Sequence, residues 1–338
     1  MRFLGRKKPL QTVLFITDAC NLSCRHCAIY NHEHPVMKPV EQIREELLYS
    51  YRLGSRFVDF EGGEPTLWRQ GEMDVNSLIA MAKEIGFYSC TITTNAQRPF
   101  GDTAADSVWV SMDGVGPVHD DIRGEGAFAR MEANVAACGH SAVSVNMTIN
   151  RRNLQNVEEA VRYVEGNPHI KQISFSFHTP YAGTEHLFVD WETRAKVVDR
   201  LIELKKKRAP IMNSVSGLKL LKTNQFKKEC WVSNFILHDG TRFAECTGKA
   251  AGYATNAALA WQGRCGRCST FVPTRCSPDC AFECSSPLVG VIPLRRFLFA
   301  MRHKICCDAS QFVLRRVAAS RSRFVLFLSS LALRRCDV

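Results

Sequence analysis

The chain has 338 residues, 46% of them hydrophobic, which is enough for one large domain with a true core and a smaller second domain. The net charge of +11 is uneven, because residues 285–338 hold 10 Lys and Arg against 2 Asp, whereas the remaining 284 residues hold 34 against 31 acidic ones. The nearly neutral main body excludes nucleic-acid binding driven by overall charge.

Fifteen cysteines are many for a chain of this length. The basic start of the sequence lacks the long apolar run of a signal peptide, so we expect a cytoplasmic protein. In that compartment metal ligation or redox chemistry explains the cysteines better than disulfides do.

Short β-type runs alternate with amphipathic helical stretches over most of the first 207 residues. Strands are predicted at residues 11–16, 56–60, 87–93, 107–112, 142–149 and 170–177. Helices are predicted at residues 39–53, 76–85, 128–137, 157–164 and 192–207. This alternation indicates an α/β fold with a parallel sheet, whose chemistry gathers in the loops at the C-terminal ends of the strands.

The loop after the first predicted strand holds Cys20, Cys24 and Cys27 in a C-x3-C-x2-C spacing. Three thiolates on one short loop can hold three irons of a [4Fe–4S] cluster and leave the fourth iron open to a ligand. Zinc sites prefer four ligands in C-x2-C pairs, so a zinc knuckle fits this spacing less well. After the second strand comes Glu61-Gly-Gly-Glu-Pro65, where glycines let the backbone approach a ligand closely and Glu64 offers hydrogen-bond acceptors.

Together these two segments resemble the radical S-adenosylmethionine (SAM) enzymes. The resemblance implies a partial (βα)6 barrel in which Cys20, Cys24 and Cys27 ligate a catalytic [4Fe–4S] cluster. The open iron would chelate SAM, and an electron from the cluster would cleave SAM to a 5′-deoxyadenosyl radical. His26 stands where the family usually has an aromatic residue.

Further segments resemble the parts of the family that bind SAM. The resemblance assigns the SAM amino group to the Gly-Gly-Glu-Pro segment, the ribose to the segment after the fourth strand, and the SAM carboxylate to an arginine that could grip it bidentately. The residues concerned are Gly62, Gly63, Glu64, Pro65, Asn95, Ser111, Asp113 and Arg123.

Several of these candidates have a purely structural alternative. Asn95 could be a turn residue, Asp113 part of a tight turn, and Arg123 a solvated surface charge. Asn146 is a further candidate for the site, or a buried side chain that only satisfies backbone groups. His178, at the end of the sixth predicted strand, could contact substrate or simply form a hydrogen bond at the strand terminus.

The alternation of strands and helices fades after residue 210. A hairpin is predicted at Phe235–Phe243, with Asp239-Gly240 as its turn. Seven cysteines accompany it: Cys230, Cys246, Cys265, Cys268, Cys276, Cys280 and Cys284. This segment resembles the SPASM extension of radical SAM enzymes, which implies one or two auxiliary iron–sulfur clusters. A zinc ribbon built on Cys265 and Cys268 is the alternative.

The expected domains are a radical SAM core at residues 1–210, a SPASM-like domain at 211–287 and a basic tail at 288–338. Residues 291–338 contain no Gly, Asn, Thr, Glu, Tyr or Trp. The tail is therefore either a basic amphipathic segment that rests on a membrane or an acidic partner, or a non-native extension without a role.

The expected function is hydrogen-atom abstraction from a peptide or protein substrate, with SAM and the clusters as cofactors. An external electron donor such as flavodoxin or ferredoxin is expected as a partner. Nucleic acid is not expected as a partner, and a membrane only through the tail. A small-molecule or cofactor-precursor substrate is one alternative, and a non-enzymatic iron–sulfur or zinc-binding protein is another.

Overall fold

The structure is a computed structural model that describes residues 8–27, 35–180, 183–223 and 233–243. The chain divides into two units, Met1–Gly290 and Val291–Val338, and every described residue lies in the first. Within the described ranges, each helix is too short or too polar to span a bilayer.

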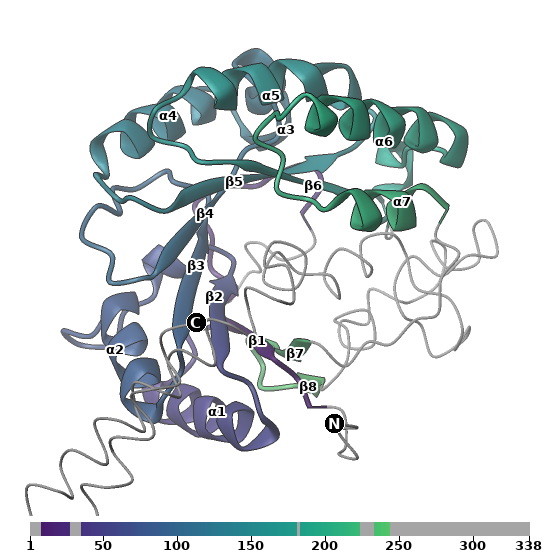
Figure 1. The fold of residues 1–338 in the computed structure, drawn as a ribbon. Helices are drawn as coiled ribbons and strands as arrows, with labels where there is room; N and C mark the ends of the chain where they lie inside the picture. The colour runs from purple at the N-terminus through teal and green to yellow at the C-terminus, as the bar shows by residue number, and fades with distance from the viewer. Residues whose placement is uncertain (1–7, 28–34, 181–182, 224–232, 244–338) are drawn as a thin grey trace, which may run out of the picture. The chain divides into compact units, whose positions relative to one another are not determined.

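One sheet runs through the described residues, with its strands in the order β6-β5-β4-β3-β2-β1-β7-β8 (Figure 1). Strands β1 to β7 pair in parallel, and β8 pairs antiparallel with β7. The strands are β1 Gln11–Thr17, β2 Phe57–Gly62, β3 Ser89–Thr94, β4 Ser107–Ser111, β5 Val143–Ile149, β6 Ile173–Phe177, β7 Ser233–Ile236 and β8 Arg242–Phe243.

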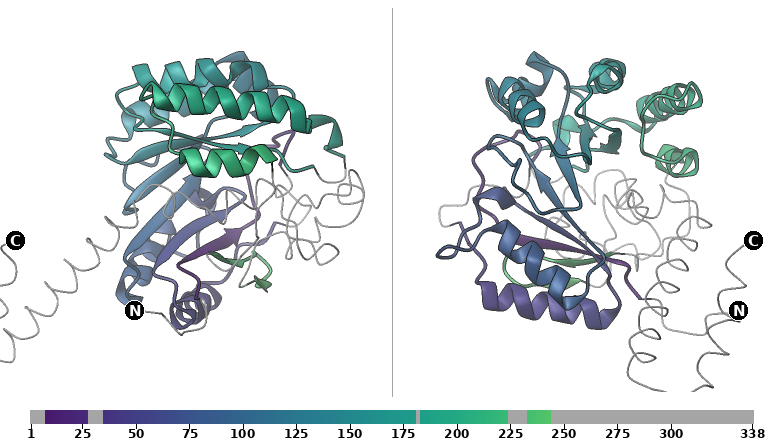
Figure 2. Two further views of the ribbon diagram at one scale, coloured as in Figure 1. Left: turned by 45° about the vertical axis from the view of Figure 1, so that its right-hand side comes forward. Right: turned by 60° about the vertical axis from the view of Figure 1, so that its left-hand side comes forward.

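The helices cover the outer side of this curved sheet (Figures 1 and 2). They are α1 Val40–Leu53, α2 Val75–Ile85, α3 Pro117–Arg123, α4 Ala127–Ala137, α5 Val157–Gly166, α6 Trp191–Lys206 and α7 Val215–Thr223, with short 3-10 turns η1 Pro65–Leu67, η2 Leu154–Asn156 and η3 Glu185–Leu187. The predicted partial α/β barrel is thereby confirmed. Gly54 and Gly86, which follow α1 and α2, have positive φ angles of 122° and 112°, as expected of residues that end a helix.

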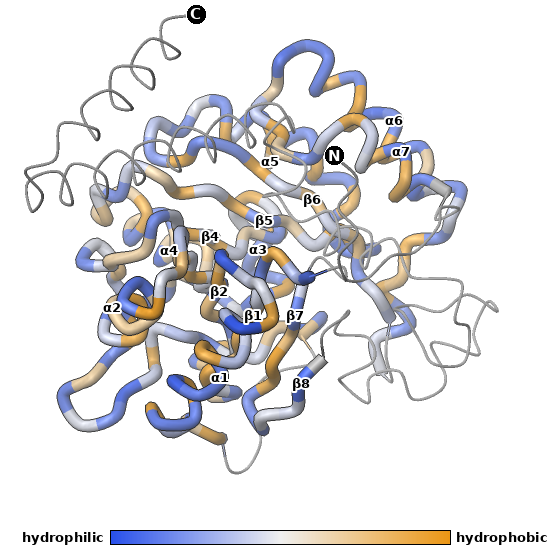
Figure 3. Tube along the Cα trace, turned by 60° about the horizontal axis from the view of Figure 1, so that its bottom comes forward, coloured by the Kyte–Doolittle hydropathy of each residue, from blue (hydrophilic) through white to orange (hydrophobic). Residues whose placement is uncertain are grey.

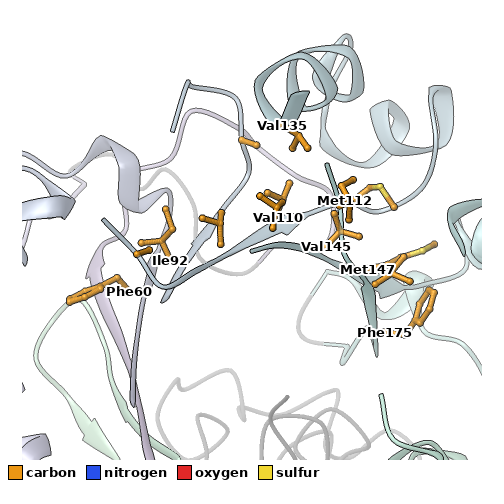
Figure 4. Packing of buried hydrophobic residues seen from close by; sticks show 14 of the residues in the cluster. Phe60, Ile92, Val110, Met112, Val135, Val145, Met147 and Phe175 are labelled. Carbon is orange, nitrogen blue, oxygen red and sulfur yellow. The ribbon is translucent and has the colours of Figure 1, made fainter. Parts of the chain in front are cut away.

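The sheet has an apolar outer face and a largely polar inner face. Every second residue of the strands packs into the main core, and Figure 4 shows members of that core on successive strands. The labelled strand residues are Phe60, Ile92, Val110, Val145, Met147 and Phe175. Hydrophobic and hydrophilic residues also alternate along the helices (Figure 3), as expected where one helix face is buried. The intervening strand residues are free to build a site on the inner face.

Two helices and one pairing differ from the sequence prediction. Helix α3 spans only seven residues, too few for a helical period to be visible, and α7 lies where the sequence alternation fades. The predicted hairpin is confirmed by the pairing of Phe235 with Phe243. Its first strand also pairs with β1, from Gln11–Ser233 to Leu14–Ile236, so the hairpin extends the core sheet.

Candidate active site

The cysteine loop leaves the C-terminal end of β1, at the edge of the sheet where chemistry was predicted. Cys24 is buried, Cys20 and Cys27 are half-buried, and none of the three is in a disulfide. Burial raises the pKa of the Cys20 and Cys24 thiols, and the charge of Arg123 opposes that rise at Cys24. The loop is also anchored to α3, because the Arg25 amide donates to the Ile122 carbonyl at 3.0 Å.

The glycine pair after β2 packs directly against this loop. The amides of Gly63 and Glu64 donate to the carbonyls of Thr17 and Ala19, both at 2.8 Å. A Cβ atom on Gly63 would lie 2.2 Å from the Ala19 carbonyl oxygen, and one on Gly62 would lie 2.1 Å from that of Thr17. The backbone that these glycines approach is therefore that of the cysteine loop, a contact that sequence reasoning did not foresee.

The Glu64 carboxylate joins the loop after β2 to the end of β3. It is 1% exposed and accepts hydrogen bonds from the Thr66 amide and hydroxyl, the Thr94 hydroxyl and the Asn95 amide, at 2.6–3.1 Å. Burial raises the pKa of Glu64, and these donors oppose the rise. Pro65 is the first residue of η1. The role of this segment toward the SAM amino group stays a prediction.

Asn95 reaches the cysteine loop from β3. Its Nδ2 donates to Asn21 Oδ1 at 2.8 Å and lies 3.7 Å from the Cys20 sulfur. Its Oδ1 accepts from the Gln97 amide at 3.0 Å, so it also serves as a turn residue. Both interpretations of Asn95 therefore fit the structure.

Asp113 and Arg123 form a buried ion pair beside the cysteines. Arg123 Nε lies 2.7 Å from Asp113 Oδ2, and its Nη1 lies 3.8 Å from Cys24 Sγ. The Arg123 side chain is 10% exposed, so it is not a solvated surface charge. Burial alone would raise the pKa of Asp113, but the Arg123 charge, the nearby His26 and His119 and the Thr148 amide together lower it. The Thr148 amide also donates to Asp113 at 2.9 Å.

His26 links this pair to the end of β6. Its Nε2 lies 3.5 Å from Asp113 Oδ2, and its ring meets that of His178 edge-on with centroids 6.4 Å apart. Within the described residues, His26 Nδ1 is buried without a hydrogen-bond partner. His178 is itself buried and hydrogen-bonds the Thr184 hydroxyl at 3.0 Å. Ser111 ends β4 close by, in register with Asn146 on β5.

The donor set of the loop suits an iron–sulfur cluster. No three His, Cys, Asp or Glu side chains of the described residues already converge on a point that could hold a metal ion. The three thiols nevertheless share one loop, and Arg123 supplies a positive charge beside Cys24, which favours the thiolate form that ligates iron. The seven later cysteines, Cys230 to Cys284, lie outside the described residues.

The comparisons with known proteins agree with this geometry. Residues 14–164 match the Radical SAM superfamily, a range that contains the cysteine loop and every SAM-binding candidate. Mycofactocin maturase MftC of Mycobacterium tuberculosis is 30% identical over 166 residues, covering 46% of this chain and 41% of that protein. Pre-heme d1 synthase of Dinoroseobacter shibae is 27% identical over 195 residues, covering 53% and 46%. The chain thus spans less than half the length of these curated relatives.

Solved structures share the fold. SuiB of Streptococcus suis bound to S-adenosylmethionine matches with a TM-score of 0.58 and 16% identity, covering 75% of this chain and 66% of that one. The enzyme anSMEcpe with bound AdoMet matches with a TM-score of 0.55 and 16% identity, covering 72% and 75%. The described residues, a half-barrel with a three-cysteine loop at the end of its first strand, therefore share their fold with these solved structures. Residues 14–164, somewhat under half of the chain, match the Radical SAM superfamily, and the fold of the described residues agrees with that match.

Proposed function

We propose that this chain is a radical SAM enzyme that modifies a peptide or protein. The observation that carries the proposal is the meeting of four separate segments at one edge of the sheet. The cysteine loop, the glycine pair, Asn95 and Asp113 follow successive strands, and the glycine pair, Asn95 and the Arg123 partner of Asp113 each contact the cysteine loop directly. An electron carrier would not need the last three of these segments.

In this proposal Cys20, Cys24 and Cys27 hold a [4Fe–4S] cluster, and SAM binds beside it. When bound, the two together supply reductive cleavage of SAM and abstraction of a hydrogen atom from the substrate. The chain's own part is to fix the loop and to keep a positive charge next to it, which Gly63 and Arg123 do. Ser111 and Asp113 would orient SAM at the ends of the strands.

The names of the relatives support the substrate class. MftC is a maturase, and SuiB has been crystallised with its precursor peptide SuiA. A small-molecule substrate is the second candidate, because pre-heme d1 synthase and GTP 3′,8-cyclase are also among the relatives. A SPASM-like auxiliary iron–sulfur domain over residues 211–287, an external electron donor and a cytoplasmic location are parts of the same proposal.

The direct test is SAM cleavage by anaerobically reconstituted full-length protein under a strong reductant. Wild type should release 5′-deoxyadenosine, and Cys20→Ala, Cys24→Ala or Cys27→Ala should abolish the release because each removes an iron ligand. Cys138→Ala is the matched control, since this buried cysteine lies at the end of α4, outside the site. Cleavage that survives in all three loop variants would refute the proposal.

The auxiliary clusters need a separate measurement. A protein with all three loop cysteines changed to Ala should still bind iron and sulfide, because other thiolates hold the remaining clusters. If this variant carries zinc and no sulfide, the late cysteines form a zinc module and the SPASM-like part of the proposal is wrong.

A further inference from the structure

The main chain of Asp113 is fixed by hydrogen bonds as firmly as its side chain. The Asp113 amide donates to His119 Nδ1 at 3.2 Å, and the Asp113 carbonyl accepts from Asn153 Nδ2 at 3.0 Å. All three residues are 0% exposed. The carboxylate accepts from Arg123 Nε and from the Thr148 amide, so every polar group of Asp113 has a partner. The turn after β4 is therefore held in one arrangement by groups outside it.

Helix α3 holds Asp113 at two points. His119 and Arg123 lie about one helical turn apart on α3, so they stand on the same side of the helix. His119 binds the amide of Asp113, and Arg123 binds its carboxylate. The same helix also supplies the Ile122 carbonyl that accepts the Arg25 amide of the cysteine loop. One short helix thus connects the end of β4, the Asp113–Arg123 pair and the cysteine loop.

The imidazole of His119 does more than fill space. Because Nδ1 accepts the Asp113 amide, the ring is neutral and its proton lies on Nε2. Burial and the Arg123 charge lower the pKa of His119 to about 4, which agrees with a neutral ring. Nε2 is buried without a hydrogen-bond partner among the described residues, and the ring packs edge-on against Phe128 with centroids 5.6 Å apart. A phenyl ring would pack there without burying an unpaired N–H, so packing alone does not account for a histidine.

We propose that His119 is a positioning residue for SAM, which holds the Asp113–Arg123 pair in place by accepting the Asp113 amide. The inference rests on the proposed function, because it concerns how the SAM site of that enzyme is kept in shape. His119 acts through Asp113 and does not itself contact SAM. Side chains of a binding site must be held within about 0.5 Å of their productive positions. Without the His119 acceptor, the buried Asp113 amide finds a new partner only if the turn after β4 moves.

The test compares two substitutions that separate hydrogen bonding from packing. His119→Asn keeps an acceptor, because the side-chain oxygen of Asn lies about where Nδ1 of His does, but it removes the ring that packs against Phe128. His119→Phe keeps a ring and removes the acceptor. SAM affinity is measured by equilibrium dialysis of anaerobically reconstituted full-length protein without a reductant. Thermal unfolding of the same proteins is followed by circular dichroism, and their iron content is determined.

SAM affinity and stability should follow opposite orders. His119→Phe should weaken SAM binding by about three- to tenfold, as expected when one neutral hydrogen bond is lost, and His119→Asn should weaken it less. The Asn variant should nevertheless unfold at the lower temperature, because it leaves a cavity beside Phe128. His140→Phe is the matched control. His140 Nδ1 also accepts a main-chain amide, that of Ala142 at 3.1 Å, but it lies before β5 at the opposite edge of the sheet, so SAM affinity should not change.

Each outcome decides the inference. Unchanged SAM affinity in His119→Phe, or a greater loss of affinity in His119→Asn than in His119→Phe, would overturn it and leave the histidine a packing role. If His119→Asn does not fold, His119→Phe is repeated in an Asp113→Ala background, where no further loss of affinity is expected because the positioned carboxylate is absent. An equal further loss there would show that His119 does not act through Asp113. Wild type that binds no SAM would refute the proposed function, whereas wild-type binding with the variants in the wrong order refutes the inference alone.

Discussion

A buried ion pair fastens the β7–β8 hairpin to the core and gives the sharpest stability prediction. Lys38 Nζ lies 2.7 Å from Glu46 Oε2 and donates to the Leu237 carbonyl at 2.7 Å. The side chains of Lys38 and Glu46 are both 0% exposed. Burial lowers the pKa of Lys38, and the Glu46 charge opposes this. Sequence alone would place Lys38 in solvent. In the structure Lys38, which follows the cysteine loop, connects α1 to the hairpin.

Lys38→Met should destabilise the protein strongly, because it leaves the Glu46 carboxylate buried without its cation. Removing one partner of a buried pair typically costs about 3–5 kcal/mol. The double variant Lys38→Met/Glu46→Leu should cost only about 1–3 kcal/mol, because it removes both charges and leaves only neutral groups, the Leu237 carbonyl and the Gln42 side-chain amide, without these partners. The double variant is thus expected to be more stable than the single one.

The measurement is urea denaturation of the apo protein, followed by circular dichroism, for wild type and the variants. Lys196→Met is the control, since Lys196 and its partner Glu192 are 74% and 80% exposed. Solvent screens such an exposed helical pair, so its loss should change stability little. If Lys38→Met costs no more than Lys196→Met, or if the double variant is no more stable than the single one, the reasoning from desolvation is refuted.

Two further predictions concern the cysteine loop and its charged neighbour. Gly63→Ala should lower iron incorporation, because the new Cβ would lie 2.2 Å from the Ala19 carbonyl oxygen. Gly166→Ala is the control and should not lower it, because a Cβ at Gly166 would meet open space. Equal iron content in the two reconstituted variants would contradict the prediction. Arg123→Ala should weaken SAM binding by about tenfold or more in equilibrium dialysis. Arg123→Lys should restore part of the affinity by keeping a charge beside Asp113; unchanged affinity in Arg123→Ala would remove Arg123 from the SAM site.

The order of strands and helices could be predicted because it depends on local patterns. Strand β5 is buried at every second position, and Gly54 and Gly86 end their helices by adopting positive φ. Both the alternation that marks a strand and the glycine that ends a helix can be recognised within a few residues of sequence. That the candidate residues lie near one another could also be predicted. Asn95 and Asp113 lie just after β3 and β4, and Arg123 ends the short helix α3 that follows β4, at the edge where a parallel sheet brings distant loops together.

The partners within the site could not be predicted, because they depend on contacts between distant residues. Asp113 and Arg123 were assigned to different parts of SAM, yet they pair with each other in the structure. The burial and pairing of Lys38 could not be predicted, because its acceptor Leu237 lies 199 residues further along the chain. The pairing of β7 with β1 is equally non-local, and a four-residue strand carries too short a pattern to reveal its neighbour.

The cysteine loop is held by several elements at once, and this bears on how the site would work. The Gly63 amide fixes its start, Asn95 reaches its side chains, and the Ile122 carbonyl at the end of α3 holds the Arg25 amide. The hairpin contributes as well, because His238 Nε2 lies 3.4 Å from Asp18 Oδ2, two residues before Cys20. A loop anchored from β2, β3, α3 and the hairpin loses little conformational entropy when it binds a cluster. The fold would therefore prepare the loop to ligate the proposed cluster, and a change in the hairpin can reach the three loop cysteines through Asp18.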